Sequence, residues 1–135
     1  MEGREVIKAF VPGACVPWSV SRHRGGKEVA LTSFQQKIQA FVSSACKRME
    51  TCAMRLQFDF VIPRPKRPKY WYPKRKDLTN LQKAAEDALT GLCFTDDSQV
   101  VEIASRKRYP VGDEADGVHI QISVVRQPQR RAKRT

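Results

Sequence analysis

Carboxylates at two places in the chain, on either side of a short helix-forming segment, are the residues best suited to chemistry. Asp77 precedes that segment, and Asp96 and Asp97 follow it. Carboxylates held about 4 Å apart repel by roughly 4 kcal/mol at an effective dielectric constant of 20, so they gather only with a proton or a cation between them. Their hard oxygen atoms suit Mg²⁺, which polarises a phosphate and activates water. The plainer alternative is that Asp77 caps a helix and that Asp96 and Asp97 lie in a solvated turn.

The segment between these carboxylates has the pattern of an amphipathic helix from about Thr79 to Thr90. A capping pattern begins at Thr79, and Gly91 follows as a C-terminal stop. Thr79, Lys83 and Glu86 share one polar stripe opposite the apolar residues, so Lys83 could contact a phosphate or stabilise charge developing on it. The alternative is an ordinary exposed Lys83–Glu86 pair, which contributes only a few tenths of a kcal/mol.

Positive charge is concentrated in two short segments. The chain has 25 Lys and Arg against 14 Asp and Glu, a formal net charge of +11. Residues 64–76 hold seven of these bases and residues 126–135 hold five, with no acid in either segment, which leaves 13 bases and 14 acids elsewhere. Such clustering is typical of proteins that bind nucleic acid. A solubilising tail and contact with an acidic membrane are the alternatives.

The first basic segment has the composition of an arm at 63–76 that leaves a strand. Four prolines exclude regular structure there, and Tyr70, Trp71 and Tyr72 interrupt the bases. Such rings can stack on bases or on the exposed pairs of a DNA junction, while lysine and arginine hold the backbone. The rings could equally be core residues at the base of a loop. The predicted DNA-binding residues are Lys66, Lys69, Lys74, Arg75, Lys76 and Thr79.

The rest of the pattern predicts an α+β fold: a single two-layer domain over residues 1–125, followed by a basic tail at 126–135 that we expect to be disordered. Residues 12–31 are expected as a loop, and a first helix is expected to begin at Thr32 or Ser33. Strands are predicted at residues 5–11, 56–62, 100–109 and 118–124, the last two forming a hairpin. The order β-α-β-α-β-β predicts a mixed sheet with two helices on one face.

Composition and motifs exclude several classes of protein. No apolar run approaches the length of a membrane span, and no glycine-rich phosphate loop indicates a nucleotide cofactor. The four cysteines contain no Cys-x-x-Cys pair and match no zinc module, so we expect reduced thiols. The N-terminus has no secretory signal pattern, and the expected location is cytoplasmic.

The segment from Lys76 to Val101 resembles a known family. It reads KDLTNLQKAAEDALTG and, further on, DDSQVV. This is similar to the pattern D-x-D-N-L-x-K, D-A-L and D-D-x-Q-V of the RusA family of Holliday junction resolvases. The resemblance implies a bacterial or phage-encoded, homodimeric, Mg²⁺-dependent endonuclease that nicks four-way DNA junctions symmetrically in recombination and repair.

Position by position, the resemblance implies roles for the residues considered above. Asp77 and Asp97 match the essential acidic residues that hold the metal ion, and Asp96 lies beside Asp97. Lys83 matches the catalytic lysine, and Lys76 matches a basic position near the phosphates.

One position departs from the family pattern. Thr79 stands where the family has a second aspartate, so a negative ligand is missing. We hypothesise that Glu86, two turns along the same stripe, supplies the missing carboxylate. The alternatives are a catalytically inactive nucleic-acid-binding protein, whose acids only cap and solvate, and a small basic ribosome-associated protein.

Overall fold

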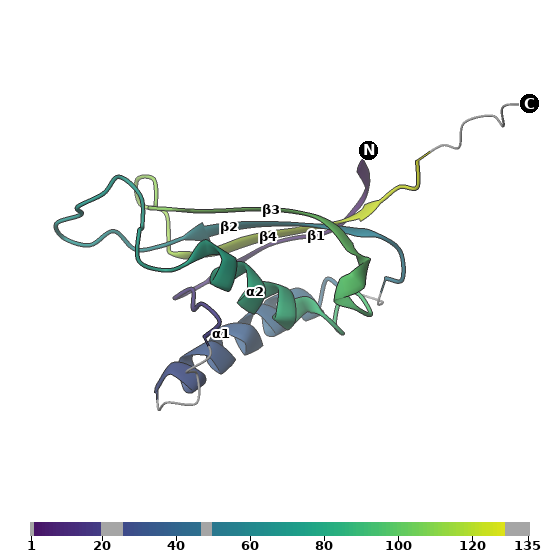
Figure 1. The fold of residues 1–135 in the computed structure, drawn as a ribbon, viewed down its shortest axis with the longest axis horizontal. Coiled ribbons are helices and arrows are strands. Elements are labelled where there is room, and N and C mark those ends of the chain that lie inside the picture. Colours follow the sequence, from purple (N-terminus) through teal and green to yellow (C-terminus); the bar gives the residue numbers. More distant parts are fainter. Residues whose placement is uncertain (1, 20–25, 47–49, 129–135) are drawn as a thin grey trace, which may run out of the picture.

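A computed structural model describes residues 2–19, 26–46 and 50–128 of the chain. These residues form two layers, a four-stranded sheet with both helices on one of its faces (Figure 1). In chain order the elements are β1 (Glu2–Pro12), α1 (Gly26–Ser43), β2 (Met54–Val61), α2 (Leu78–Leu89), the 3₁₀ turn η1 (Asp97–Gln99), β3 (Val100–Arg108) and β4 (Gly117–Val125). The predicted α+β class and the order β-α-β-α-β-β are confirmed.

The strands lie in the order β1-β4-β2-β3. Strand β4 is antiparallel to both β1 and β2, whereas β3 is parallel to β2, so the sheet is mixed as predicted. The predicted hairpin between the last two strands is wrong, because β2 separates β3 from β4. The cause is the connection through α2: a strand-helix-strand unit places β3 parallel to β2, and β4 pairs on the other side of β2.

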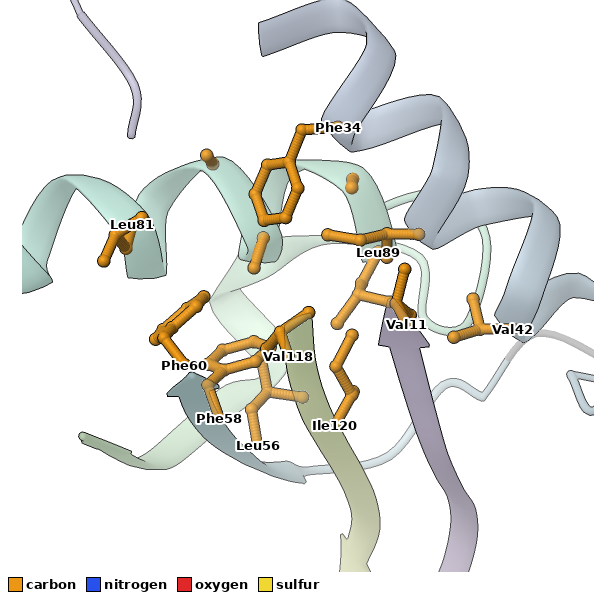
Figure 2. Packing of buried hydrophobic residues seen from close by; sticks show 14 of the residues in the cluster. Val11, Phe34, Val42, Leu56, Phe58, Phe60, Leu81, Leu89, Val118 and Ile120 are labelled. Atoms are coloured by element: carbon orange, nitrogen blue, oxygen red, sulfur yellow. The ribbon is translucent and has the colours of Figure 1, made fainter. Parts of the chain in front are cut away.

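The core lies between the sheet and the helices. Alternate residues of the two central strands are at most 2% exposed on the helix side, namely Leu56, Phe58, Phe60, Val118, Ile120 and Ile122. In Figure 2, Phe34 of α1 and Leu81 and Leu89 of α2 approach these side chains from the helix layer. The alternation expected for the strands is therefore confirmed as an apolar inner face.

Helix α1 begins at Gly26, earlier than the predicted start at Thr32 or Ser33. The earlier turn is favourable because it adds Leu31, which is 4% exposed, to the buried face. That face excludes Phe41, which is 45% exposed. It consists of Leu31, Phe34, Ile38 and Val42. Part of the predicted loop, residues 20–25, lies outside the described residues.

Helix α2 closely follows its prediction. Its buried residues are those of the predicted apolar face, Leu81, Ala84, Ala85, Ala88 and Leu89. The small side chains of Ala84 and Ala88 let α1 approach closely, because Gln35 Nε2 of α1 donates to the Ala84 carbonyl oxygen at 3.0 Å and Gln39 Nε2 donates to that of Ala88 at 3.2 Å. Gly91 follows the helix with φ 83°, a left-handed conformation that suits glycine at this position.

The expectation of four reduced thiols is wrong for one pair. Cys46 and Cys93 form a disulfide, with their Cα atoms 5.6 Å apart. Each cysteine follows the end of a helix, and the packing of α1 against α2 brings the two ends together, which the spacing in the sequence does not reveal. Cys15, which is buried, and Cys52, which is exposed, are free thiols.

The basic tail falls mostly beyond the described residues. Residues 126–128 have no regular secondary structure, and residues 129–135 lie outside the part of the chain that the structure describes, so the expected disorder stays a prediction. Within the described residues, no helix has the length and apolar character needed to cross a membrane.

Candidate active site

Asp77 lies at the start of α2, where it acts as the N-cap. Its Oδ1 atom accepts a hydrogen bond from the Thr79 backbone N–H at 3.0 Å. The cap is therefore Asp77 and not Thr79, which the capping pattern had favoured. A carboxylate is well suited to this position because it satisfies an unpaired backbone donor and faces the positive end of the helix dipole. Beside it, Lys76 Nζ donates to the Cys15 carbonyl oxygen, which anchors the segment that follows β1 against the start of α2.

The predicted polar stripe lies on the exposed side of α2, and one aromatic residue from another segment contacts it. Lys83 is exposed, and its Nζ atom lies 4.4 Å from the centroid of the Trp18 ring. The Trp18 backbone N–H donates to the Asn80 carbonyl oxygen at 2.9 Å, so the ring is fixed to the same helix. Sequence reasoning missed Trp18, because nothing in the sequence links it to a lysine so distant along the chain.

Asp96 stabilises the turn that follows α2. It caps η1, accepting hydrogen bonds from both the hydroxyl and the backbone N–H of Ser98, and these bonds lower the pKa of Asp96. The Gln99 side chain completes the turn, since its Oε1 accepts from the Asp96 N–H at 2.9 Å. Asp96 therefore caps a 3₁₀ turn and Asp97 is exposed at its first position, which agrees with the alternative of a solvated turn.

Glu86 lies within electrostatic range of Asp97. Glu86 is half-buried on the polar stripe of α2. Its pKa is raised, first by burial and then by the negative charges of Asp97 and Asp87, while Lys83 acts in the opposite direction. A carboxylate whose ionised form is disfavoured in this way is suited to bind a cation, which would remove both the desolvation penalty and the repulsion.

Asp77 immediately precedes the start of α2, whereas Asp97 lies in η1, which follows the end of α2 and precedes the start of β3. Lys107, near the end of β3, donates to the carbonyl oxygen of Lys76 at 2.6 Å, directly beside Asp77. Asp97 instead precedes the start of β3 at Val100, and the seven residue steps to Lys107 span roughly 23 Å. The expectation that Asp77 and Asp97 meet is therefore not fulfilled within one chain.

The residues implied as metal ligands thus fall into two places. Asp97 lies with Glu86 at one end of the stripe, whereas Asp77 lies with Thr79 at the other. Among the residues that the structure describes, no group of three or more His, Cys, Asp or Glu side chains is arranged to hold a metal ion.

The predicted DNA-binding residues occupy the same end of the sheet as the start of α2. The arm at 63–76 leaves the end of β2, projects beyond the sheet and returns to α2 (Figure 1). Four of its predicted contacts are exposed, Lys66, Lys69, Lys74 and Arg75. Lys76 is half-buried, and Thr79 is exposed on the first turn of the helix.

A second polar cluster, which the sequence did not indicate, lies on the sheet face away from the helices. Asp59 of β2 accepts from Arg106 and Arg108 of β3, each at 3.0 Å. Arg108 also pairs with Glu114 at 2.7 Å, and this bond, together with one from the Val111 N–H, lowers the pKa of Glu114 to about 2. Each cation has a carboxylate partner, so the cluster serves to hold β3 and the connection to β4 against β2.

Comparison with known proteins agrees with this fold and with the motif around α2. The family model described as Endodeoxyribonuclease RusA matches residues 20–123. The chain belongs to the RusA family. A curated relative of this RusA-family chain, the crossover junction endodeoxyribonuclease rusA of Lactococcus phage r1t, is 38% identical to it over 69 residues. The match covers 50% of each protein, so the chain spans about half the length of that relative.

In this RusA-family chain the matched region includes α2, η1 and the arm. That region therefore contains two carboxylates within electrostatic range of each other, a lysine held by an aromatic ring and an acid-free run of bases. Chemically, the pair suits a hard cation, the lysine suits a phosphate oxygen and the arm suits a DNA backbone.

Proposed function

We propose that this protein is a crossover junction endodeoxyribonuclease, which resolves four-way DNA junctions in recombination and repair by paired, Mg²⁺-dependent nicks. The single observation that supports it most is that Glu86, whose pKa is raised by burial and by the negative charge of Asp97, lies on the same helix stripe as Lys83, in a chain of the RusA family. The curated relative with that printed name agrees with the proposal over the half of the chain that it matches.

Glu86 and Asp97 are the residues that would hold the metal ion. Mg²⁺ commonly binds through one or two carboxylates and keeps several water molecules, so two ligands from the protein fit its chemistry. The raised pKa of Glu86 supports this choice, since a bound cation would offset the burial of that carboxylate and the negative charge of Asp97. When bound, the ion would activate a water molecule and neutralise charge on the scissile phosphate.

Lys83 is the proposed catalytic lysine. Its ammonium group projects from the same stripe as Glu86, and Trp18 holds it over a ring face 4.4 Å away. It would contact a non-bridging oxygen of the scissile phosphate and stabilise the negative charge that grows there as the bond breaks.

Asp77 and Asp96 would act by positioning other residues. Asp77 caps α2 and so fixes the turn from which Thr79 and Lys83 project. Asp96 caps η1 and so fixes Asp97. The proposal therefore modifies what the resemblance implies, because it gives the ion to Glu86 and Asp97 and not to Asp77.

The arm would bind the DNA backbone, and a homodimer would provide two sites. Exposed lysines and arginines in a segment without acids neutralise phosphates, and Lys76 lies where the arm joins α2. A four-way junction has two equivalent strands to cut, and a two-fold dimer presents two active sites in matching symmetry.

The test is incubation of the full chain with an end-labelled four-way junction and with a linear duplex of matched sequence, each with Mg²⁺ or with EDTA. We expect paired nicks in the junction only, and only with Mg²⁺. Asp97→Asn should lower the cleavage rate at least about 100-fold, since even indirect partners of a metal ligand typically cost 10- to 100-fold. Asp113→Asn, which removes an exposed carboxylate from the connection between β3 and β4, is the matched control and should cleave normally.

A catalytically inactive nucleic-acid-binding protein is the second candidate. The observation that favours it is that, among the described residues, three metal-ligating side chains do not gather. Tight junction binding without a Mg²⁺-dependent cut in the wild-type chain would establish this candidate and reject the enzyme. Preference for structured RNA over the junction would instead favour a ribosome-associated role.

A further inference from the structure

Trp71, at the far part of the arm, is the most exposed large apolar residue of those described. It is 87% exposed, compared with 43% for Tyr70. The alternative that these rings form the base of a loop is therefore wrong for Trp71. Single exposed apolar residues are common and need no function. Trp71 differs from them in its surroundings, because it lies within a run of seven bases and no acid, residues 64–76.

The arm that carries Trp71 is anchored at both ends. At its start, the Arg64 guanidinium lies 4.8 Å from the centroid of the Tyr109 ring. At its end, Lys107 Nζ donates to the carbonyl oxygens of Lys74 and Lys76, at 3.4 and 2.6 Å. These contacts fix both ends of the arm relative to β3, so Trp71 is carried at the end of the sheet where α2 begins.

The neighbouring rings support the indole but leave most of it uncovered. Tyr72 meets Trp71 in an edge-on contact with ring centroids 5.1 Å apart, and Tyr70 lies 5.6 Å from Tyr72. Lys74 Nζ lies 4.6 Å from the centroid of the Tyr70 ring and 3.2 Å from its hydroxyl oxygen. Tyr70 and Tyr72 are thus engaged by partners within the arm, whereas Trp71 presents its ring to solvent.

We propose that Trp71 stacks on a base exposed where a DNA duplex branches, and that it makes the protein prefer branched over linear DNA. Within a continuous duplex each base pair is covered on both faces by its neighbours, so an indole has no ring to stack on. At a branch point the terminal pairs of the arms lose a neighbour and can accept one. The positive charge around Trp71 complements the phosphates that surround such a point.

This inference rests on the proposed function, because it names the feature of the junction that the protein would recognise. It adds a determinant of specificity outside α2 and independent of metal ions. It can therefore be tested by binding alone, under conditions in which no strand is cut.

The experiment measures equilibrium binding in EDTA of the full-length wild type, Trp71→Ala and Trp71→Phe. The probes are a four-way junction and a linear duplex of the same sequence. Stacking on a base is worth about 1–3 kcal/mol by alanine substitution, so Trp71→Ala should weaken junction binding about tenfold while duplex binding changes less than about twofold. Trp71→Phe keeps a ring and should retain most of the preference. A 2-aminopurine base at the branch point should change its fluorescence with the wild type and not with Trp71→Ala.

Phe41→Ala is the matched control, since it removes an exposed aromatic ring from α1 and should leave both affinities unchanged. If Trp71→Ala lost equal affinity for the junction and the duplex, or lost affinity for neither, the stacking role of Trp71 would be overturned. Trp71-dependent binding to vesicles of phosphatidylcholine and phosphatidylserine without any effect on the junction would also overturn it. If the wild type binds no DNA, the proposed function itself fails, which is a different result from junction binding that ignores Trp71.

Discussion

The contact between Lys83 and Trp18 joins two segments that are distant along the chain. A cation over an aromatic ring is held by about 0.5–1 kcal/mol at an exposed site, enough to restrict the orientations of a flexible side chain. In this structure the Trp18 N–H is also bonded to α2, so ring and lysine belong to one rigid unit. Trp18 is therefore a positioning residue for the proposed catalytic lysine.

We predict that Trp18→Leu slows junction cleavage about threefold to fivefold, the factor that corresponds to the loss of one such contact. Trp18→Phe keeps an aromatic face and should restore most of the rate. The measurement is single-turnover cleavage at saturating protein, with junction affinity determined separately in EDTA. Equal rates for the leucine and phenylalanine variants, or a loss of affinity without a loss of rate, would contradict the positioning role.

The local periodicity of the sequence was sufficient to predict some site residues and not others. The polar stripe with Lys83 and Glu86 follows from helical spacing alone, and it is confirmed as the exposed side of α2. Two contacts depend on how the chain folds back: the ring of Trp18 over Lys83, and the placement of Asp97 beside Glu86 and away from Asp77. The spacing of residues along the chain does not predict such contacts between separate elements.

Helix α2 is constrained on both of its sides. One side buries small residues against α1, and the other presents the candidate site. Because Ala84 is fully buried and its carbonyl oxygen accepts from Gln35, α1 and α2 lie too close together for a larger side chain at this position.

Ala84→Leu should therefore lower the free energy of unfolding by about 1–3 kcal/mol, the usual cost of overpacking a core. Ala40→Leu, on the exposed side of α1, is the control and should change it by less than about 0.5 kcal/mol. Urea denaturation followed by circular dichroism measures both. An Ala84→Leu variant as stable as the wild type would show that the two helices are not closely packed.

On the sheet face away from the helices, the ionisation of Glu114 should make the stability of the fold depend on pH. The bonds from Arg108 and the Val111 N–H lower the pKa of Glu114 from 4.5 to about 2. A carboxyl group with a lowered folded-state pKa stabilises the fold above its unfolded pKa and loses that contribution as pH falls toward the folded one. Thermal stability should thus decline between about pH 4.5 and pH 2, and less steeply in Glu114→Gln. If the thermal stability of the wild type and of Glu114→Gln fell equally steeply with decreasing pH, this role for Glu114 would be ruled out.

The strands themselves were predicted more reliably than their order in the sheet. Alternating apolar residues identify each strand, since one face must be buried against helices. Which strands are neighbours depends on the path of α2 across the sheet, and the short link between β3 and β4 wrongly suggested a hairpin. The Cys46–Cys93 disulfide was missed for the same reason, because it reports the packing of two helix ends.

Over the whole molecule, charge is distributed unevenly. Residues 64–76 carry seven bases and no acid, and they project from the end of the sheet where α2 begins. Bases elsewhere are paired in several places, as Arg106 and Arg108 are with Asp59. The arm is therefore the part of the described surface where positive charge is best able to meet a phosphate backbone.

Affinity for duplex DNA should fall with salt, and the arm should account for part of the slope. Each neutralised phosphate contributes about 0.9 to the decrease of log K with log salt. The double variant Lys66→Ala, Lys69→Ala should thus reduce the slope by about 1.8, whereas Lys8→Ala, Lys37→Ala, on β1 and α1, should leave it nearly unchanged. Fluorescence anisotropy over a salt series measures it. Equal slopes for the two double variants would show that the arm makes no special contribution.

The proposed mechanism requires Glu86, together with Asp97, to hold the cation needed for strand cleavage. Its most direct test is single-turnover cleavage of a four-way junction by Glu86→Gln in Mg²⁺, with junction affinity measured in EDTA. The amide keeps the size of the side chain and removes its charge, so we predict an affinity within about twofold of the wild type and a cleavage rate at least about 100-fold lower. Near-normal cleavage by Glu86→Gln would contradict the assignment of the metal site.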